Sequence, residues 1–253
     1  MNVHGWHSKV GGTGTIPLVC VHGWCCNSTQ FDRLSGLLGM EFRVYQPDLP
    51  GHGQTPLGDF APGFDTYATA LADWIAATIP EPVVLVGHSM GGALSLMVAG
   101  LVPVRAVINL DGSLPAKAAT LAAQAAIRTW LDEPGFRERL ANALREGFFL
   151  PSERDAEAEE VIRTMCSAPE AVLRFLPEKI GTLDAPRILS KVSAPLLYVG
   201  AENPRFDEEQ ARQLIPHLGL AQIRNTGHFL HMRAPEHIAR LIRSFLNPTS
   251  KAE

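Results

Sequence analysis

A serine between two glycines follows an apolar run, in a position where its hydroxyl could act as a nucleophile. The run at 83–86 leads into residues 87–91, GHSMG in one-letter code, and an apolar stretch over 93–99 follows. This order predicts a buried strand, a sharp turn and a helix. A strained turn of this kind would lift the hydroxyl of Ser89 above the carboxyl end of the strand.

The hydroxyl needs a base, because a serine is a weak nucleophile at neutral pH. His228 is the candidate, since it follows a weak strand pattern at 221–223 and precedes an amphipathic helical pattern that begins at Pro235. His231 and His237 lie nearby, but they lack carboxylate or cysteine partners at a recognised metal-binding spacing. We therefore predict neither a metal nor a cofactor.

The elements that would position these residues alternate between short strands and helices. Strand signals occur at 18–21, 43–45, 83–86, 104–110, 196–199 and, weakly, 221–223. Helical patterns separate them, for example an apolar stripe at four-residue intervals over 67–79. This alternation predicts an α/β fold with a mainly parallel sheet covered by helices on both faces.

The alternation stops between residues 113 and 190, where helical patterns follow one another without a convincing strand. These patterns cover about 116–131, 134–146, 155–167 and 169–176. We interpret the segment as a helical lid, so we predict a core domain formed by residues 1–112 and 191–253 and a helical cap formed by residues 113–190. The acidic run at 155–160 is expected to be a solvated helix face.

The serine turn, with its strand before and its helix after, resembles the nucleophile elbow of the α/β-hydrolase superfamily. Residues 22–24 (HGW) resemble the turn after that family's third strand, and 48–53 (DLPGHG) resemble the loop after the next strand. The resemblance implies an α/β-hydrolase fold with a helical lid inserted after the family's sixth strand. It also implies that the backbone N–H groups of Trp24 and Met90 form an oxyanion hole.

The acid that would orient His228 departs from the usual pattern of the superfamily. Most members carry an aspartate shortly after the strand that corresponds to 196–199, whereas this chain has Asn203 near that place. An amide is a poor substitute, because it does not fix the tautomer of the histidine. Another carboxylate is therefore expected to take this role.

Asp111 is the preferred candidate. It directly follows the strand at 104–110, which would neighbour the strand at 196–199 at a spacing of about 4.8 Å if the family's strand order holds. Some relatives with helical lids place the acid there, and the chain order of serine, aspartate and histidine is that of the fold. Glu202 and Asp207 remain open as alternatives.

These residues predict a serine hydrolase. Ser89 would attack the carbonyl of a small apolar ester, lactone or related acyl compound, and His228, oriented by Asp111, would accept its proton on the way to an acyl-enzyme. The predicted substrate-binding residues are Trp24, His88, Trp130, Phe136, Phe148 and Phe149.

Two other functions fit parts of the pattern. Residues 22–25 (HGWC), Asp111 after its strand and the missing later aspartate also resemble cofactor-independent 2,4-dioxygenases of 3-hydroxy-4-quinolones. In those enzymes a His-Asp pair deprotonates the substrate hydroxyl and the anion reacts with dioxygen, and here His228 and Asp111 would form the pair. A ligand receptor with vestigial hydrolysis, as in some signalling members of the superfamily, is a third hypothesis.

The composition narrows the class of partner. A formal net charge of −4 over 253 residues gives no electrostatic reason to expect nucleic acid or an anionic membrane. The sequence shows no recognisable signal peptide and no apolar run of membrane-spanning length, so we expect a cytoplasmic monomer or homodimer that acts on a small molecule. The four cysteines show neither a disulfide framework nor zinc-site spacing.

Overall fold

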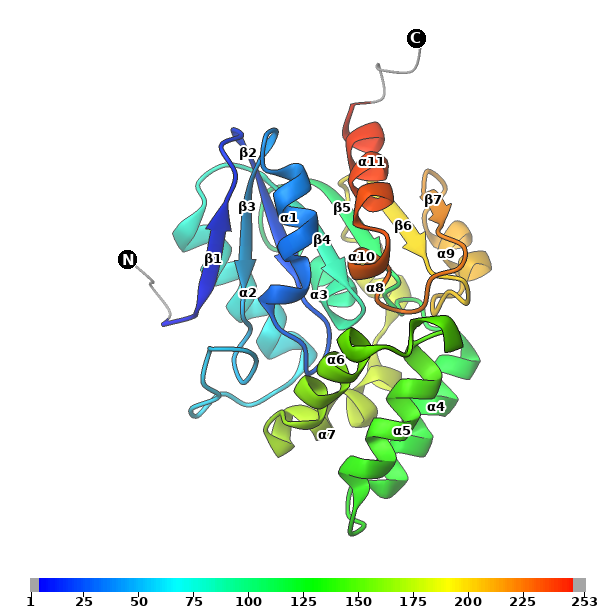
Figure 1. Cartoon of the computed structure of the whole chain (residues 1–253). Coiled ribbons are helices and arrows are strands. Elements are labelled where there is room, and N and C mark those ends of the chain that lie inside the picture. Colours follow the sequence, from blue (N-terminus) through cyan, green and yellow to red (C-terminus); the bar gives the residue numbers. More distant parts are fainter. Residues whose placement is uncertain (1–4, 248–253) are drawn as a thin grey trace.

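A seven-stranded sheet forms the centre of the computed structural model, which describes residues 5–247 (Figure 1). In chain order the strands are β1 Ser8–Gly11, β2 Ile16–Val21, β3 Phe42–Pro47, β4 Val83–His88, β5 Val104–Leu110, β6 Leu196–Gly200 and β7 Gly219–Gln222. Across the sheet their order is β1-β3-β2-β4-β5-β6-β7. Only the β1–β3 pair is antiparallel within this sheet, so the predicted mainly parallel arrangement is confirmed.

Helices cover both faces of this sheet (Figure 1). They are η1 Ser28–Phe31, α1 Asp32–Leu38, α2 Phe64–Thr78, α3 Met90–Val98, α8 Ala185–Leu189, α9 Glu208–Leu214, α10 Leu230–Arg233 and α11 Pro235–Leu246. Successive side chains of a strand point to opposite faces. In β2, Leu18 and Cys20 therefore join the apolar core formed with α1 and α11, whereas Val19 and Val21 join the core formed with α2 and α3.

A helical cap separates β5 from β6 in the chain and lies at one end of the sheet (Figure 1). It contains α4 Ala118–Trp130, α5 Phe136–Phe148, η2 Pro151–Glu153, α6 Ala156–Cys166, α7 Glu170–Lys179 and η3 Ile180–Thr182. The α/β-hydrolase fold with an inserted helical cap is thus confirmed. The cap follows β5, the fifth strand of the described residues. This is the sixth strand in the family's numbering, in which β2 counts as the third strand although only β1 precedes it here.

Ion pairs connect the cap to the core through the acidic run that we expected to be a solvated face. Arg233, the last residue of α10, pairs with Asp155 at 2.8 Å and Glu157 at 3.0 Å, and Arg33 of α1 pairs with Glu157 at 2.9 Å. The acidic side chains of this run remain exposed or partly exposed, as expected, and some of them also pair with basic side chains of the core. All four side chains remain at least partly exposed, so each pair contributes modestly to stability.

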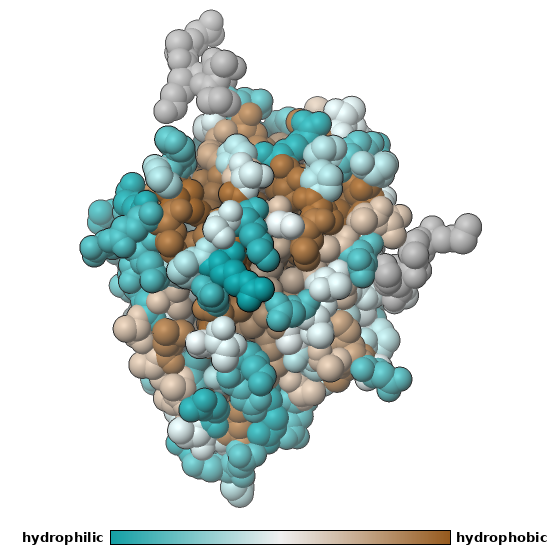
Figure 2. All heavy atoms as spheres, turned by 180° about the vertical axis from the view of Figure 1, so that it is seen from behind, coloured by the Kyte–Doolittle hydropathy of each residue, from teal (hydrophilic) through white to brown (hydrophobic). Residues whose placement is uncertain are grey.

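The surface seen from behind mixes hydrophilic residues with hydrophobic groups that gather in its upper half (Figure 2). Among the described residues, the exposed large hydrophobic side chains are Val10, Met40 and Leu101.

No helix within residues 5–247 combines the length and apolar character that crossing a bilayer requires.

Candidate active site

Ser89 occupies a strained turn between β4 and α3. Its backbone has φ 55° and ψ −118°, a conformation that side-chain-bearing residues rarely adopt. A Cβ atom at Gly87 would lie 2.2 Å from the carbonyl oxygen of Gly91, and one at Gly91 would lie 2.1 Å from that of Val21. Only glycine fits at these two positions, which explains the G-x-S-x-G pattern and holds the serine at the carboxyl end of the sheet.

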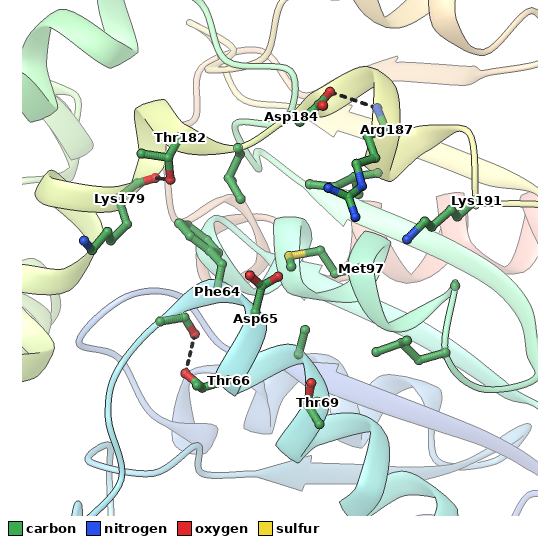
Figure 3. Close-up of a pocket in the computed structure, with 16 residues that line it drawn as sticks. Phe64, Asp65, Thr66, Thr69, Met97, Lys179, Thr182, Asp184, Arg187 and Lys191 are labelled. Atoms are coloured by element: carbon green, nitrogen blue, oxygen red, sulfur yellow. Dashed lines mark hydrogen bonds between the residues drawn. The ribbon is translucent and has the colours of Figure 1, made fainter.

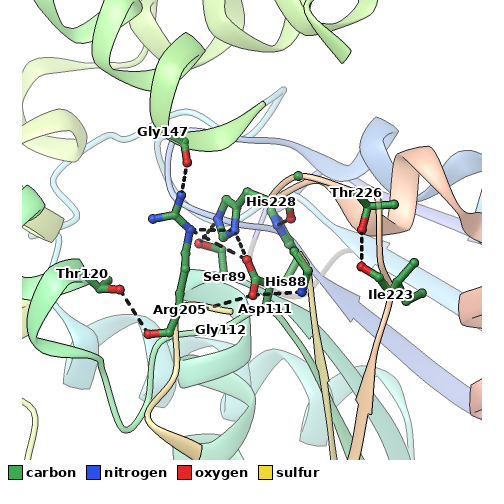
Figure 4. Close-up of polar contacts among 12 residues, drawn as sticks. His88, Ser89, Asp111, Gly112, Thr120, Gly147, Arg205, Ile223, Thr226 and His228 are labelled. Atoms are coloured by element: carbon green, nitrogen blue, oxygen red, sulfur yellow. Dashed lines mark hydrogen bonds and ion pairs between the residues drawn. The ribbon is translucent and has the colours of Figure 1, made fainter. Parts of the chain in front are cut away.

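Ser89, His228 and Asp111 meet although they are far apart in the sequence (Figure 4). The distance between Nε2 of His228 and Oγ of Ser89 is 2.8 Å, and that between Nδ1 of His228 and Oδ2 of Asp111 is 2.7 Å. The imidazole and the carboxylate are almost completely buried. This is the arrangement in which a histidine can remove the proton of a serine hydroxyl while a carboxylate fixes the imidazole tautomer.

Asp111 is held by the neighbouring strand and by the loop after it. Its φ is 48°, and its backbone N–H continues the ladder by donating to the carbonyl of Val199 at 2.8 Å. Its Oδ1 accepts the N–H groups of Ala201 and Arg205, each at 3.3 Å. The loop after β6 thus supplies two backbone donors to the carboxylate, while Asn203 in the same loop is exposed.

The two rival carboxylates have other partners. Glu202 accepts the backbone N–H of Asn225 at 2.7 Å, and Asp207 accepts that of Gln210 at 3.0 Å as the N-cap of α9. His228 is hydrogen-bonded to neither of them. Asp111 is therefore the carboxylate that the structure brings to the imidazole.

Arg205 is a site residue that the sequence did not reveal. Its Nε lies 3.0 Å from Nδ1 of His228 and 3.8 Å from Oδ2 of Asp111, and its guanidinium carbon lies 4.4 Å from the centre of the Phe148 ring. The loop that carries it has no local pattern that predicts this approach. The only indication in the sequence is that Arg205 lies two residues after Asn203, near the position where the family's usual aspartate is expected.

Burial controls the protonation of the paired groups. It lowers the pKa of His228 well below its usual value, and the positive charge of Arg205 lowers it further. Burial raises the pKa of Asp111 to about 7, against the opposing effects of Arg205 and the backbone N–H of Ala201. The imidazole is therefore neutral at pH 7, as a general base must be.

A small cavity of about 20 Å³ lies above Ser89 beneath the cap. Trp24 and Met90 line it together with Ser89, His228 and Phe148. Met90 is the first residue of α3, so its N–H has no partner within the helix and is available to a ligand. The indole of Trp24 is anchored instead to the cap, where its Nε1 donates to the carbonyl of Val172 at 2.7 Å.

The structure places the other predicted pocket residues in three different surroundings. His88 lines the cavity but is fully buried, and its Nε2 contacts the carbonyl oxygen of His228 at 2.9 Å, which fixes the loop of the base. Phe149 lines an adjoining cavity of about 80 Å³, which Arg205 also lines. Trp130 and Phe136 line neither cavity: Arg139 stacks on Trp130 and Arg137 stacks on Phe136, at 4.7 and 5.3 Å. The structure thus corrects the expectation that these two aromatic rings lie at the serine.

A larger cleft of about 550 Å³ lies elsewhere, between α2, α3 and the segment that joins the cap to β6 (Figure 3). Its walls carry charged side chains such as Asp65, Lys179 and Arg187. None of the described residues that line it is a serine, cysteine or histidine, whereas the smaller cavity contains both Ser89 and His228 and is therefore the candidate site. No cluster of three or more histidine, cysteine or acidic residues suited to a metal occurs within residues 5–247.

Comparison with known proteins agrees with the fold. Residues 18–241 match the Alpha/beta hydrolase family. The pimeloyl-[acyl-carrier protein] methyl ester esterase of Neisseria meningitidis serogroup B is 30% identical over 246 residues, which cover 89% of this chain and 91% of that protein. A hydrolase from Oleispira antarctica superposes with a TM-score of 0.84 at 19% identity, over 97% of this chain and 96% of that one. A thermophilic esterase from Thermogutta terrifontis superposes with a TM-score of 0.79 at 24% identity, over 96% and 93%. The chain therefore belongs to the Alpha/beta hydrolase family.

Proposed function

We propose that the protein is a serine hydrolase that cleaves a small ester, lactone or related acyl compound through an acyl-enzyme. The observation that carries this proposal is the continuous hydrogen-bonded chain from Ser89 through His228 to Asp111. The curated relative from Neisseria meningitidis is a methyl ester esterase, which supports the same class of reaction.

The mechanism follows from the geometry. His228 Nε2 accepts the hydroxyl proton as Ser89 Oγ attacks the substrate carbonyl, and the N–H groups of Trp24 and Met90 bind the developing oxyanion. The imidazolium then protonates the leaving alcohol. Water, deprotonated by the same imidazole, attacks the acyl-enzyme, and the imidazolium returns the proton to Ser89 as the acid leaves. Each turnover consumes one water and releases one acid and one alcohol from an ester, or one hydroxy acid from a lactone.

The cavity fits a small acyl group better than a long one. Its apolar walls come largely from the cap, with Met165, Leu176 and Ile180 facing the serine turn. Because the enclosed space is only about 20 Å³, a substrate must displace cap side chains to enter. We therefore propose short-chain esters or lactones as the first compounds to assay.

Hydrolysis of p-nitrophenyl butyrate and γ-butyrolactone tests the proposal. We expect turnover by the wild type, with and without oxygen, and its loss by at least about 10³-fold in Ser89→Ala, because the nucleophile is removed. Full activity in Ser89→Ala would exclude the acyl-enzyme route. Oxygen-dependent consumption of a 3-hydroxy-4-quinolone would instead favour the dioxygenase, and tight ligand binding with negligible turnover would favour the receptor.

A further inference from the structure

Arg205 brings a positive charge that serine hydrolysis by itself does not require. One of its terminal nitrogens, Nη2, donates to the carbonyl of Gly147 in the cap, and its Nε faces His228 (Figure 4). The other terminal nitrogen, Nη1, has no hydrogen-bond partner among residues 5–247. The side chain is only 17% exposed and lines the cavity at Ser89, so its guanidinium keeps a donor that no described residue uses.

This charge alters what the site can bind. A buried carboxylate such as Asp111 repels an anionic substrate, because electrostatic interactions are strong where water is excluded. Arg205 offsets that charge, so the pair together with a neutral His228 is close to electrically neutral. Lys117 adds a more distant positive charge, whereas Glu146 lines the adjoining cavity together with Arg205.

A second polar group lines the same cavity from the cap. Gln124 of α4 is 5% exposed, and its Oε1 is buried without a hydrogen-bond partner among the described residues. A buried amide of this kind is costly unless a ligand completes its hydrogen bonds. The amide can present either its oxygen or its NH₂ group, and an NH₂ group that lines the same cavity as a guanidinium is suited to a carboxylate.

The histidine itself gives a reason for Arg205 to move toward a substrate. Nδ1 of His228 has both Asp111 and the Nε–H of Arg205 within hydrogen-bonding distance, but it can serve only one of them. A general base needs hydrogen on Nδ1, donated to Asp111, so that Nε2 can accept the proton of Ser89. In that tautomer the Nε–H of Arg205 faces another N–H, and a carboxylate that draws the guanidinium away relieves this conflict.

We propose that Arg205, assisted by Gln124, binds a free carboxylate of the substrate, so that the preferred substrates are monoesters or lactones of acids that carry a second carboxylate. The inference rests on the proposed hydrolase function and narrows its substrate class. Cleavage of a dicarboxylic monoester adds one water and releases a dicarboxylic acid and an alcohol, while the recognised carboxylate is unchanged throughout.

Three esters of matched shape test this inference: monomethyl succinate, its neutral amide methyl succinamate, and its apolar isostere methyl 4-methylpentanoate. We expect kcat/KM of the wild type for the anionic ester to exceed both others by about 10- to 100-fold, the range of a charge-assisted hydrogen bond. Arg205→Met should abolish this preference, and Arg205→Lys should retain part of it, because lysine keeps the charge but not the planar fork. Arg212→Met, on exposed α9, is the matched control and should keep the preference.

Labelling of Ser89 by a fluorophosphonate separates failure of the inference from failure of the proposed function. If Ser89 is labelled and the three esters are hydrolysed without preference, or Arg205→Met lowers all three equally, the inference is overturned and the hydrolase stands. If Ser89 is labelled but no ester is hydrolysed, protection from the label by monomethyl succinate in the wild type and not in Arg205→Met supports the inference, and absence of protection overturns it. If Ser89 is not labelled, the proposed function fails and the inference fails with it.

Discussion

At the scale of single residues, the carboxylate that contacts His228 comes from the end of β5 rather than from the loop after β6. That loop instead provides the N–H groups of Ala201 and Arg205, which hold Oδ1 of Asp111 while Oδ2 faces His228. A carboxylate can move to the neighbouring strand because adjacent strands are only about 4.8 Å apart. The imidazole therefore keeps its partner although the usual position holds an amide.

Asp111→Asn tests this role of the carboxylate. We expect kcat to fall by about 10⁴-fold, as when the corresponding aspartate of a serine protease becomes asparagine, because the amide stabilises the wrong tautomer of His228. Asp207→Asn and Glu202→Gln are the controls, since both keep an oxygen for the backbone N–H groups they accept. Steady-state assays would contradict the assignment if either control lost as much activity as Asp111→Asn.

The charge of Arg205 should also be visible in the pH profile. Arg205 lowers the pKa values of both His228 and Asp111, because a nearby cation disfavours the imidazolium and favours the carboxylate. In Arg205→Met both pKa values rise, so the acid limb of kcat/KM for a neutral ester should move to higher pH. A limb that stays in place or moves to lower pH in that assay, compared with Arg212→Met, would count against this electrostatic role.

The sequence was sufficient to predict three residues of the candidate site, Ser89, His228 and Asp111, but not Arg205. Ser89 and His228 lie in or beside recognisable local patterns, and Asp111 follows a clear strand. Arg205 reaches the imidazole only because the loop after β6 folds back over Asp111, and no local pattern encodes such a loop. Trp130 and Phe136 show the same difficulty, since which way a cap aromatic faces depends on how the helices pack.

At the scale of elements, the turn between β4 and α3 determines the position of Ser89. The strand brings Gly87 against Gly91, and the helix brings Gly91 against the carbonyl of Val21 in β2. The same close contacts that expose Ser89 therefore hold β4, α3 and β2 together. Stability and activity should be linked at this turn.

The substitution Gly91→Ala is expected to lower both the stability and the activity of the protein. Its Cβ would lie 2.1 Å from the backbone oxygen of Val21, which no side-chain rotation can relieve, so unfolding should become easier by about 1–3 kcal/mol or more. Gly36→Ala in α1 is the matched control, because a Cβ there meets no atom within 4 Å and alanine favours helix by roughly 0.5–1 kcal/mol. Urea unfolding measures the free energy of unfolding of each variant. Equal stability of Gly91→Ala and Gly36→Ala would be inconsistent with the packing described.

Strands and long helices could be predicted from periodicity, whereas short helices could not. The strand pattern at 104–110 coincides with β5, and four helical patterns correspond to α4, α5, α6 and α7 with boundaries that differ by a few residues. The patterns did not predict α8 or α10, which span five and four residues. A helix of about one turn shows no amphipathic period, and tertiary contacts rather than propensity stabilise it.

At the scale of the whole molecule, the cap and the core build the site together. The core provides Ser89, Asp111 and His228 at the carboxyl end of the sheet, and the cap covers them with apolar side chains. Glu153 of the cap also accepts the N–H of Gly227, the residue before the base, at 2.9 Å. The lid could be predicted from the interrupted alternation of strands and helices, but its docking could not, because ion pairs such as Arg233 with Asp155 join distant segments.

The most direct test of the account is the intact mass of the protein during turnover. After rapid acid quenching of a reaction with p-nitrophenyl butyrate, we predict a population that is heavier by one butyryl group, with peptide mapping that places the group on Ser89. The adduct should be absent in Ser89→Ala and should form far more slowly in His228→Ala. Turnover of the ester without any adduct, or an adduct on a residue other than Ser89, would contradict the claim that Ser89 is the nucleophile.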